Sequence, residues 1–181
     1  MFHSNIELLI DYWRATRGDA PLPARADIDP ADFSALLPQV FIATRRDSGV
    51  YPLRLVGEFV IDLHGHSLRG EDLMRLWAPS HRIELQLALE QALRRRDPVV
   101  ISAEAQTDEG VQLRLEVLFA PFAGPGDEAD RFLGLYQPIS TVAALRGRPI
   151  RELMIRAVGG ADTRLVGPRL RLAALDGRQI A

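Results

Sequence analysis

Apolar side chains follow a helical period near the start of the chain. Four of them lie at positions i, i+3, i+4 and i+7 and share one helix face: Ile6, Leu9, Ile10 and Trp13. Gly18 and the prolines that follow it stop this periodic stretch. The pattern predicts an amphipathic helix over residues 4–17.

A proline-rich connector over residues 21–38 leads to a region rich in β-forming residues. Runs of β-branched and aromatic residues bounded by turn residues predict five strands, over residues 40–46, 51–56, 99–106, 111–119 and 131–137. Apolar and polar side chains alternate strictly from Val111 to Val117, which is typical of a strand with one buried face. Short turns between consecutive runs favour antiparallel pairing.

The pattern becomes helical between the second and third predicted strands. Glycines divide residues 57–79 into short pieces, and a longer helix is expected from about Ser80, its predicted N-cap, to Arg96, just before Pro98. A further helix is predicted near residues 149–158. Helices inserted into a series of antiparallel strands indicate an α+β domain with a single sheet.

Several short motifs accompany this order of elements. The N-terminal half carries Leu9-Ile-Asp-Tyr-Trp-Arg14, Pro23-Ala-Arg-Ala-Asp-Ile-Asp-Pro30, Tyr51-Pro-Leu-Arg-Leu-Val-Gly57, Leu63-His-Gly65 and Leu68-Arg-Gly70, and the C-terminal half carries Phe132-Leu-Gly-Leu135 and Leu170-Arg-Leu-Ala173. Order and motifs together resemble the PAS domain, and more narrowly the single-domain PAS_5 family of alphaproteobacteria. The resemblance covers nearly the whole chain.

The resemblance implies a PAS-like five-stranded antiparallel sheet with helices on one face. An N-terminal amphipathic helix and its connector would occupy residues 1–38, the PAS core residues 39–140, and a basic C-terminal extension residues 141–181. Many PAS domains end their last strand with Asp-Ile-Thr, which leads into an output helix. Here the matching residues are Pro138-Ile139-Ser140, so this chain departs from the family pattern at that point.

The function implied by the resemblance is that of a non-enzymatic sensory or protein-interaction module, acting as a cytoplasmic regulator through a signalling or regulatory protein partner. A small ligand, whose identity the sequence leaves unknown, would bind between the sheet and the helices. The lining expected for it consists of apolar positions that face this space: Leu55, Val60, Leu63, Met74, Leu87, Ile101, Leu115 and Tyr136. Plain core packing is the other interpretation of these side chains.

Asp62, His64 and His66 form the densest group of candidate metal ligands. The alternative function is therefore a metal- or haem-dependent sensor or enzyme that uses His64 and His66, because imidazoles bind Zn²⁺, iron and copper. A closed zinc site needs more ligands than this group supplies. A helix that ends at Gly65 with exposed imidazoles is the favoured interpretation, and we expect no bound metal.

The apolar stripe of the N-terminal helix has two interpretations. It can cover the outer face of the sheet, or it can pair two copies of the chain, as such helices often do in PAS domains. A homodimer is expected, with an interface that includes Ile6, Leu9, Ile10 and Trp13.

Composition removes several classes of function. The chain has 181 residues, enough for one domain with an appendage, and no cysteine, which excludes disulfides and cysteine nucleophiles. All 22 basic residues are arginine, so Schiff-base and P-loop lysine chemistry are excluded. No serine lies in a G-x-S-x-G motif, and no apolar run is long enough to span a membrane. With no secretory signal evident, a cytoplasmic location is expected.

Charge separates the C-terminal segment from the rest of the chain. Residues 1–140 carry a net charge of −7 and residues 141–181 one of +5. Specific nucleic-acid binding is not expected, because the basic segment has no aromatic residues for base stacking. Residues 165–175 are instead expected to pack on the domain through five apolar side chains: Leu165, Val166, Leu170, Leu172 and Leu175. Arg94-Arg-Arg-Asp97 matches a short nucleotide-binding pattern but is better explained as a solvated helix end.

Overall fold

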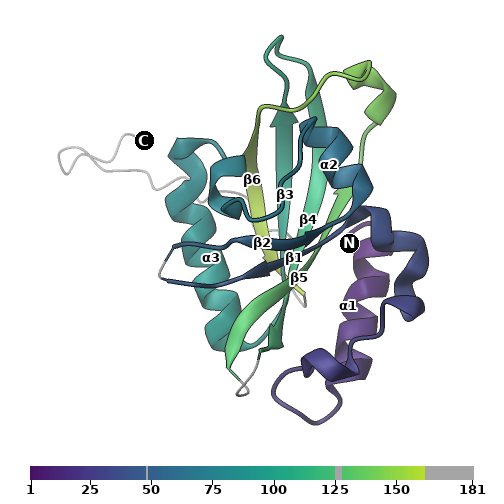
Figure 1. The fold of residues 1–181 in the computed structure, drawn as a ribbon, viewed down its shortest axis with the longest axis vertical. Helices are drawn as coiled ribbons and strands as arrows, with labels where there is room; N and C mark the ends of the chain where they lie inside the picture. The colour runs from purple at the N-terminus through teal and green to yellow at the C-terminus, as the bar shows by residue number, and fades with distance from the viewer. Residues whose placement is uncertain (48, 125–127, 162–181) are drawn as a thin grey trace, which may run out of the picture.

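The computed structural model describes residues 1–47, 49–124 and 128–161 (Figure 1). Its α-helices are α1 (Ser4–Arg17), α2 (Glu58–His64) and α3 (Arg82–Arg95). Short 3-10 helices are η1 (Arg25–Asp27), η2 (Pro30–Gln39), η3 (Leu73–Leu76), η4 (Pro79–His81) and η5 (Val142–Leu145). The strands are β1 (Val40–Thr44), β2 (Leu53–Val56), β3 (Val99–Gln106), β4 (Gln112–Ala123), β5 (Ala129–Pro138) and β6 (Glu152–Gly160).

The described strands form one antiparallel sheet in the order β2-β1-β5-β4-β3-β6. This confirms the predicted α+β class and the predicted antiparallel pairing, with six strands in place of five. The predicted helix over residues 4–17 is confirmed as α1. The long helix begins at Arg82, and the residue that precedes it is His81 rather than the expected Ser80, because the turn η4 occupies residues 79–81.

The sixth strand is the main correction to the expected architecture. The helix predicted near residues 149–158 is wrong, because Glu152–Gly160 pairs with β3 along its whole length. Leu153 and Ile155 point into the core, while β6 satisfies backbone groups that β3 would otherwise leave open at the edge of the sheet. Part of the segment 141–181 therefore belongs to the sheet.

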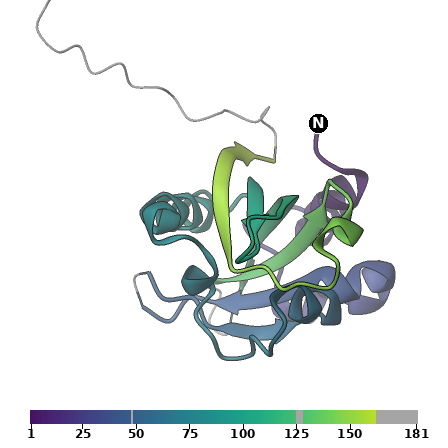
Figure 2. The ribbon, with the colours of Figure 1, turned by 90° about the horizontal axis from the view of Figure 1, so that it is seen from above.

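The face of the sheet that carries α2, η3 and α3 holds the larger core. Alternate residues of β4 point into it: Leu113, Leu115, Val117 and Phe119. The predicted alternation of this strand is thereby confirmed. Figure 2 shows α3 beside β6, which is an edge strand of the sheet.

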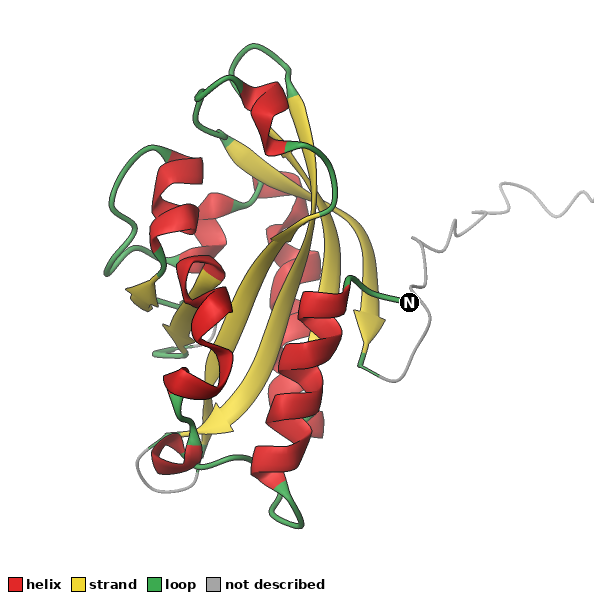
Figure 3. Ribbon diagram, turned by 90° about the vertical axis from the view of Figure 1, so that its right-hand side faces the viewer, coloured by secondary structure: helices red, strands yellow, loops and turns green. Residues whose placement is uncertain are grey.

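The opposite face of the sheet is covered by α1 and the connector that contains η2. Figure 1 shows α1 and α3 on opposite sides of the strands, and Figure 3 shows the strongly twisted sheet with helices packed against it. The remaining residues in the second half of β4 point toward this face: Leu118, Ala120 and Phe122. The strand is thus buried on both sides where α1 lies against it.

The apolar stripe of α1 lies inside this second core. Its four side chains are 0–3% exposed: Ile6, Leu9, Ile10 and Trp13. The expectation that they form an interface between two copies is corrected here, because the chain's own sheet covers them. Of the two interpretations of the stripe, the structure supports covering of the sheet.

Candidate functional site

The space between the sheet and the helical insert is filled with side chains. Six of the eight residues predicted to line a ligand are buried there together: Val60, Leu63, Met74, Ile101, Leu115 and Tyr136. The ring of Phe41 packs edge-on against Phe119 and Tyr136, with centroids 5.6 and 5.7 Å apart. A Cβ added to Gly134 would collide with the Phe41 ring. The aromatic rings therefore occupy the centre of this space.

Two predicted lining residues lie elsewhere. Leu87 is 62% exposed because it is on the outer face of α3, whose buried face is formed by other residues, such as Leu85 and Leu89. Leu55 is 46% exposed on β2, at the edge of the sheet. The expectation that these two residues line an internal site is corrected.

His64 is a buried titratable side chain that contacts Tyr136, one of the predicted lining residues. It ends α2, and Gly65 follows it in the left-handed conformation, with φ of +73°, which confirms the predicted helix end. The imidazole is 4% exposed, so the expectation of an exposed ring is wrong for His64. Its Nε2 lies 3.4 Å from the hydroxyl oxygen of Tyr136, and the two rings meet edge to face.

Burial sets the protonation of this pair. Desolvation, with a smaller contribution from His66, lowers the pKa of His64 from 6.5 to about 4. Burial alone raises the pKa of the Tyr136 hydroxyl above its ordinary value. Both groups are therefore neutral at neutral pH.

The two histidines do not converge on a common point. His66 places Nδ1 2.9 Å from the backbone oxygen of His64 and Nε2 3.4 Å from Glu71, while His64 turns Nε2 toward Tyr136. Among the residues that the structure describes, no group of three or more histidine, cysteine or acidic side chains is arranged to hold a metal ion.

An open cavity of about 440 Å³ lies beside His64. Its walls come from the end of α2, the segment that contains η3, the β3–β4 hairpin and the residues before β6: His64, Gly65, His66, Glu71, Arg75, Leu76, Asp108, Pro149, Ile150 and Arg151. Sequence reasoning named two of these residues, His64 and His66. Residues 149–151 approach them because the segment before β6 returns the chain to the end of α2, where the backbone N–H of Ile150 donates to the backbone oxygen of Leu63.

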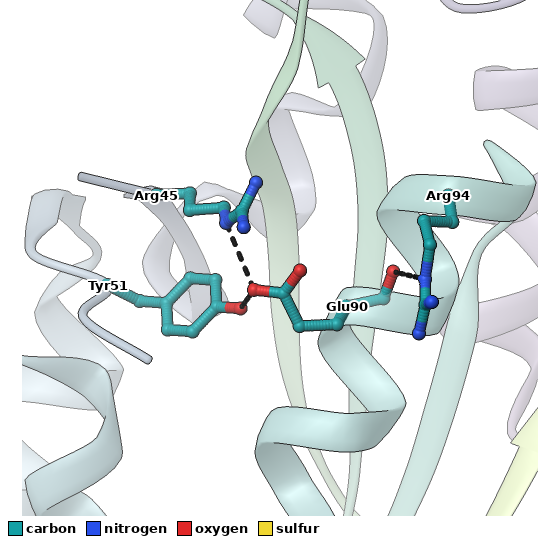
Figure 4. Close-up of polar contacts among 4 residues, drawn as sticks. All are labelled: Arg45, Tyr51, Glu90 and Arg94. Carbon is teal, nitrogen blue, oxygen red and sulfur yellow. Dashed lines mark hydrogen bonds and ion pairs between the residues drawn. The ribbon is translucent and has the colours of Figure 1, made fainter. Parts of the chain in front are cut away.

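A second polar group links the β1–β2 hairpin to α3 (Figure 4). The hydroxyl of Tyr51 donates to Oε1 of Glu90 at 2.9 Å, and Nε of Arg45 lies 3.0 Å from the same oxygen. Burial and then the bond to Glu90 raise the pKa of Tyr51. Arg94 donates to the Glu90 backbone oxygen at 3.4 Å, consistent with the predicted helix-end role of the arginine cluster. Sequence reasoning did not find the Tyr51–Glu90 contact.

The chain belongs to the PAS domain family. The PAS_5 family model, described as a PAS domain, matches residues 1–137. This confirms the resemblance read from the motifs.

Solved structures with a similar fold are PAS and light-oxygen-voltage domains. A light-oxygen-voltage domain is 13% identical, with a TM-score of 0.49, over 64% of this chain and 87% of that one. The Rhodobacter sphaeroides light-oxygen-voltage protein is 13% identical, with a TM-score of 0.48, over 65% and 72%. The PAS domain of the fruit-fly ELK potassium channel is 16% identical, with a TM-score of 0.46, over 61% and 94%. Comparison with curated protein sequences gave no significant match.

No helix in the described part of the chain combines the length and apolar character needed to cross a bilayer. The five apolar residues of the C-terminal segment, from Leu165 to Leu175, lie outside the described residues.

Proposed function

We propose that this chain is a non-enzymatic sensory or protein-interaction module that acts as a cytoplasmic regulator by binding a signalling or regulatory protein. Membership of the PAS family supports a sensory role. The filled interior supports action through the surface, because the aromatic rings leave the centre of the core occupied. The observation that carries the proposal is an apolar pair on the outer face of α3.

Ile83 and Leu87 are four residues apart on α3 and are 74% and 62% exposed. Residues at this spacing are neighbours on a helix surface, so the two side chains form one apolar spot. The β1–β2 hairpin lies against the same helix, since Gly49 is packed on the side chain of Gln86. Hairpin and helix together present a surface that a partner helix can cover through anchors at helical spacing.

The test compares two double variants of the full chain. Ile83→Ser/Leu87→Ser removes the apolar pair, and Leu8→Ser/Leu55→Ser removes two leucines that are 50% and 46% exposed elsewhere. Pull-down from the native cytoplasm with mass spectrometry should show a protein that the unmodified chain and the control variant capture and the α3 variant does not. Equal capture by both variants would contradict the proposal.

We also propose a homodimer, as expected for a PAS module. The stripe on α1 does not carry it, because those residues are buried in the chain itself. Light scattering at tens of micromolar protein should show a dimer. A micromolar Kd corresponds to a binding free energy of about −8 kcal/mol, and at this protein concentration the dimer is then populated. A monomer at this concentration would refute the idea.

The internal ligand and the metal alternative have direct tests. A ligand between sheet and helices must displace part of the aromatic packing around Phe41 and Tyr136, and mass spectrometry of small molecules extracted from the purified protein would detect it. Elemental analysis is expected to find no stoichiometric metal. About one zinc or iron per chain would favour the alternative function.

A further inference from the structure

The cavity beside His64 presents a donor with no partner in the described chain. His64 lines the cavity while being 4% exposed, so the small part of its surface that remains accessible opens there. Its Nε2 faces Tyr136. No described residue forms a hydrogen bond with its Nδ1. A ring nitrogen without a protein partner in a cavity wall is a position where a ligand group can form a hydrogen bond.

The contact with Tyr136 favours one tautomer of the neutral His64 imidazole. The Tyr136 hydroxyl is fully buried, and His64 is its polar partner within the described residues. A neutral phenol in this position satisfies its O–H by donating to Nε2. The proton of the neutral imidazole is then on Nδ1, so the ring nitrogen without a protein partner is an N–H donor.

One cationic side chain in the cavity wall has no ion-pair partner among the described residues. Glu71 lies 3.4 Å from His66, and Asp108 lies 3.6 Å from Arg151. The side chain of Arg75 is exposed, lines the cavity and forms no hydrogen bond or ion pair with any residue in the described ranges. The residues that line the cavity therefore supply an imidazole N–H and a guanidinium, a combination that recognises a carboxylate.

The rest of the wall is partly apolar. Leu76 and Ile150 are 5% and 4% exposed and line the cavity together with Pro149. A volume of about 440 Å³ lies in the range of small-molecule sites.

We propose that this cavity binds a small organic carboxylate, with the carboxylate held by Nδ1–H of His64 and by Arg75 and the apolar body against Leu76 and Ile150. The site is separate from the interior space of the PAS core and from the α3 surface. Carboxylate binding can therefore be tested independently of the proposed partner binding. One wall, at residues 149–151, comes from the segment that leads into β6. These residues lie beyond the part of the chain matched by the family model.

The first experiment is an NMR titration of the full chain with sodium benzoate, followed on the His64 ring protons. Saturable shifts are expected with benzoate, and at least fivefold weaker binding with benzamide, which has the same ring without the charge. Arg75→Gln should weaken benzoate binding at least fivefold. Arg69→Gln, an exposed arginine outside this cavity, should leave it unchanged.

The second experiment determines the tautomer of His64. Long-range ¹H–¹⁵N spectra should show the proton on Nδ1, and Tyr136→Phe should shift the ring toward the Nε2–H form. A ring protonated on Nε2 in the unmodified chain would overturn the assignment. Three further outcomes would overturn the proposed carboxylate site. They are equal binding of benzamide and benzoate, unchanged benzoate binding by the Arg75→Gln variant, and binding of inorganic phosphate without binding of benzoate.

Discussion

The indole Nε1 of Trp13 donates a hydrogen bond of 2.6 Å to the backbone oxygen of Pro121, which joins the middle of α1 to the second half of β4. The ring is 2% exposed, and the guanidinium carbon of Arg17 lies 5.0 Å from its centroid. This contact closes the second core over the outer face of the sheet. Trp13 is therefore a packing residue of the single chain.

Truncation of this side chain should destabilise the fold strongly. We expect Trp13→Ala to lower the free energy of unfolding by about 3–5 kcal/mol, because a buried aromatic ring is lost and a cavity remains. Urea denaturation measures the change. Leu8→Ala, at a residue 50% exposed on the same helix, is the matched control and should change stability by less than about 0.5 kcal/mol. Similar losses for the two variants would contradict the role given to Trp13.

The contact between Tyr51 and Glu90 should appear as an energetic coupling. Glu90→Ala leaves the hydroxyl of the buried Tyr51 without this acceptor, at a cost of about 1–3 kcal/mol. In the Tyr51→Phe background the same substitution should cost less, because no hydroxyl remains to be satisfied. A double-mutant cycle by urea denaturation measures the difference. Additive effects of the two substitutions would show that the contact contributes nothing.

Stability should fall in mild acid because of His64. The pKa of this imidazole is lowered to about 4 in the folded chain from an ordinary 6.5. Between these values the unfolded chain binds a proton that the folded chain does not, so the free energy of unfolding decreases as pH falls through this window. The full pKa shift corresponds to about 3 kcal/mol of the free energy of unfolding. This contribution to stability is fully present above pH 6.5.

Urea denaturation at pH 7 and pH 4.5 checks this dependence, with a His64→Gln variant as the comparison. The variant should show a smaller loss of stability between the two pH values than the unmodified chain. NMR titration of the His64 ring should give a midpoint near 4. A midpoint near 6.5 would show that burial does not affect this histidine.

The C-terminal segment is tested by truncation. Removing residues 162–181 keeps β6 intact and should lower the melting temperature measurably, because residues 165–175 carry the apolar side chains expected to pack on the domain. Salt should have little effect, since exposed ion pairs contribute only about 0–1 kcal/mol each. Unchanged stability after truncation would indicate instead a free basic arm that binds an acidic partner.

Local periodicity was enough to predict the elements whose pattern is strong. The stripe from Ile6 to Trp13 predicted α1, and the alternation from Val111 to Val117 predicted the buried face of β4. Residues 149–158 were predicted as a helix because Pro149 suits the first position of a helix and Gly159-Gly160 forms a break after Val158. Its strand conformation depends on the hydrogen bonds that β3 offers, which are made by residues distant in sequence.

Which side of an element is buried was harder to predict. Leu55 and Leu87 are apolar and lie on correctly predicted elements, yet both point outward. His64 was expected at the surface and is buried beside Tyr136, since the return of the chain at Ile150 covers the end of α2. An apolar residue indicates only that burial is favourable; which neighbour buries it depends on the packing of the elements.

The sequence by itself determined the family, the α+β class and the positions of most helices and strands, because these follow from local periodicity, turn residues and recurring motifs. Only the tertiary structure decided that α1 is covered by its own sheet, that β6 extends the sheet beside β3, and that Arg75 and Ile150 share a cavity with His64. The physical reason is that burial and pairing are relations between segments far apart in the chain, and they are fixed when the two faces of the sheet are covered.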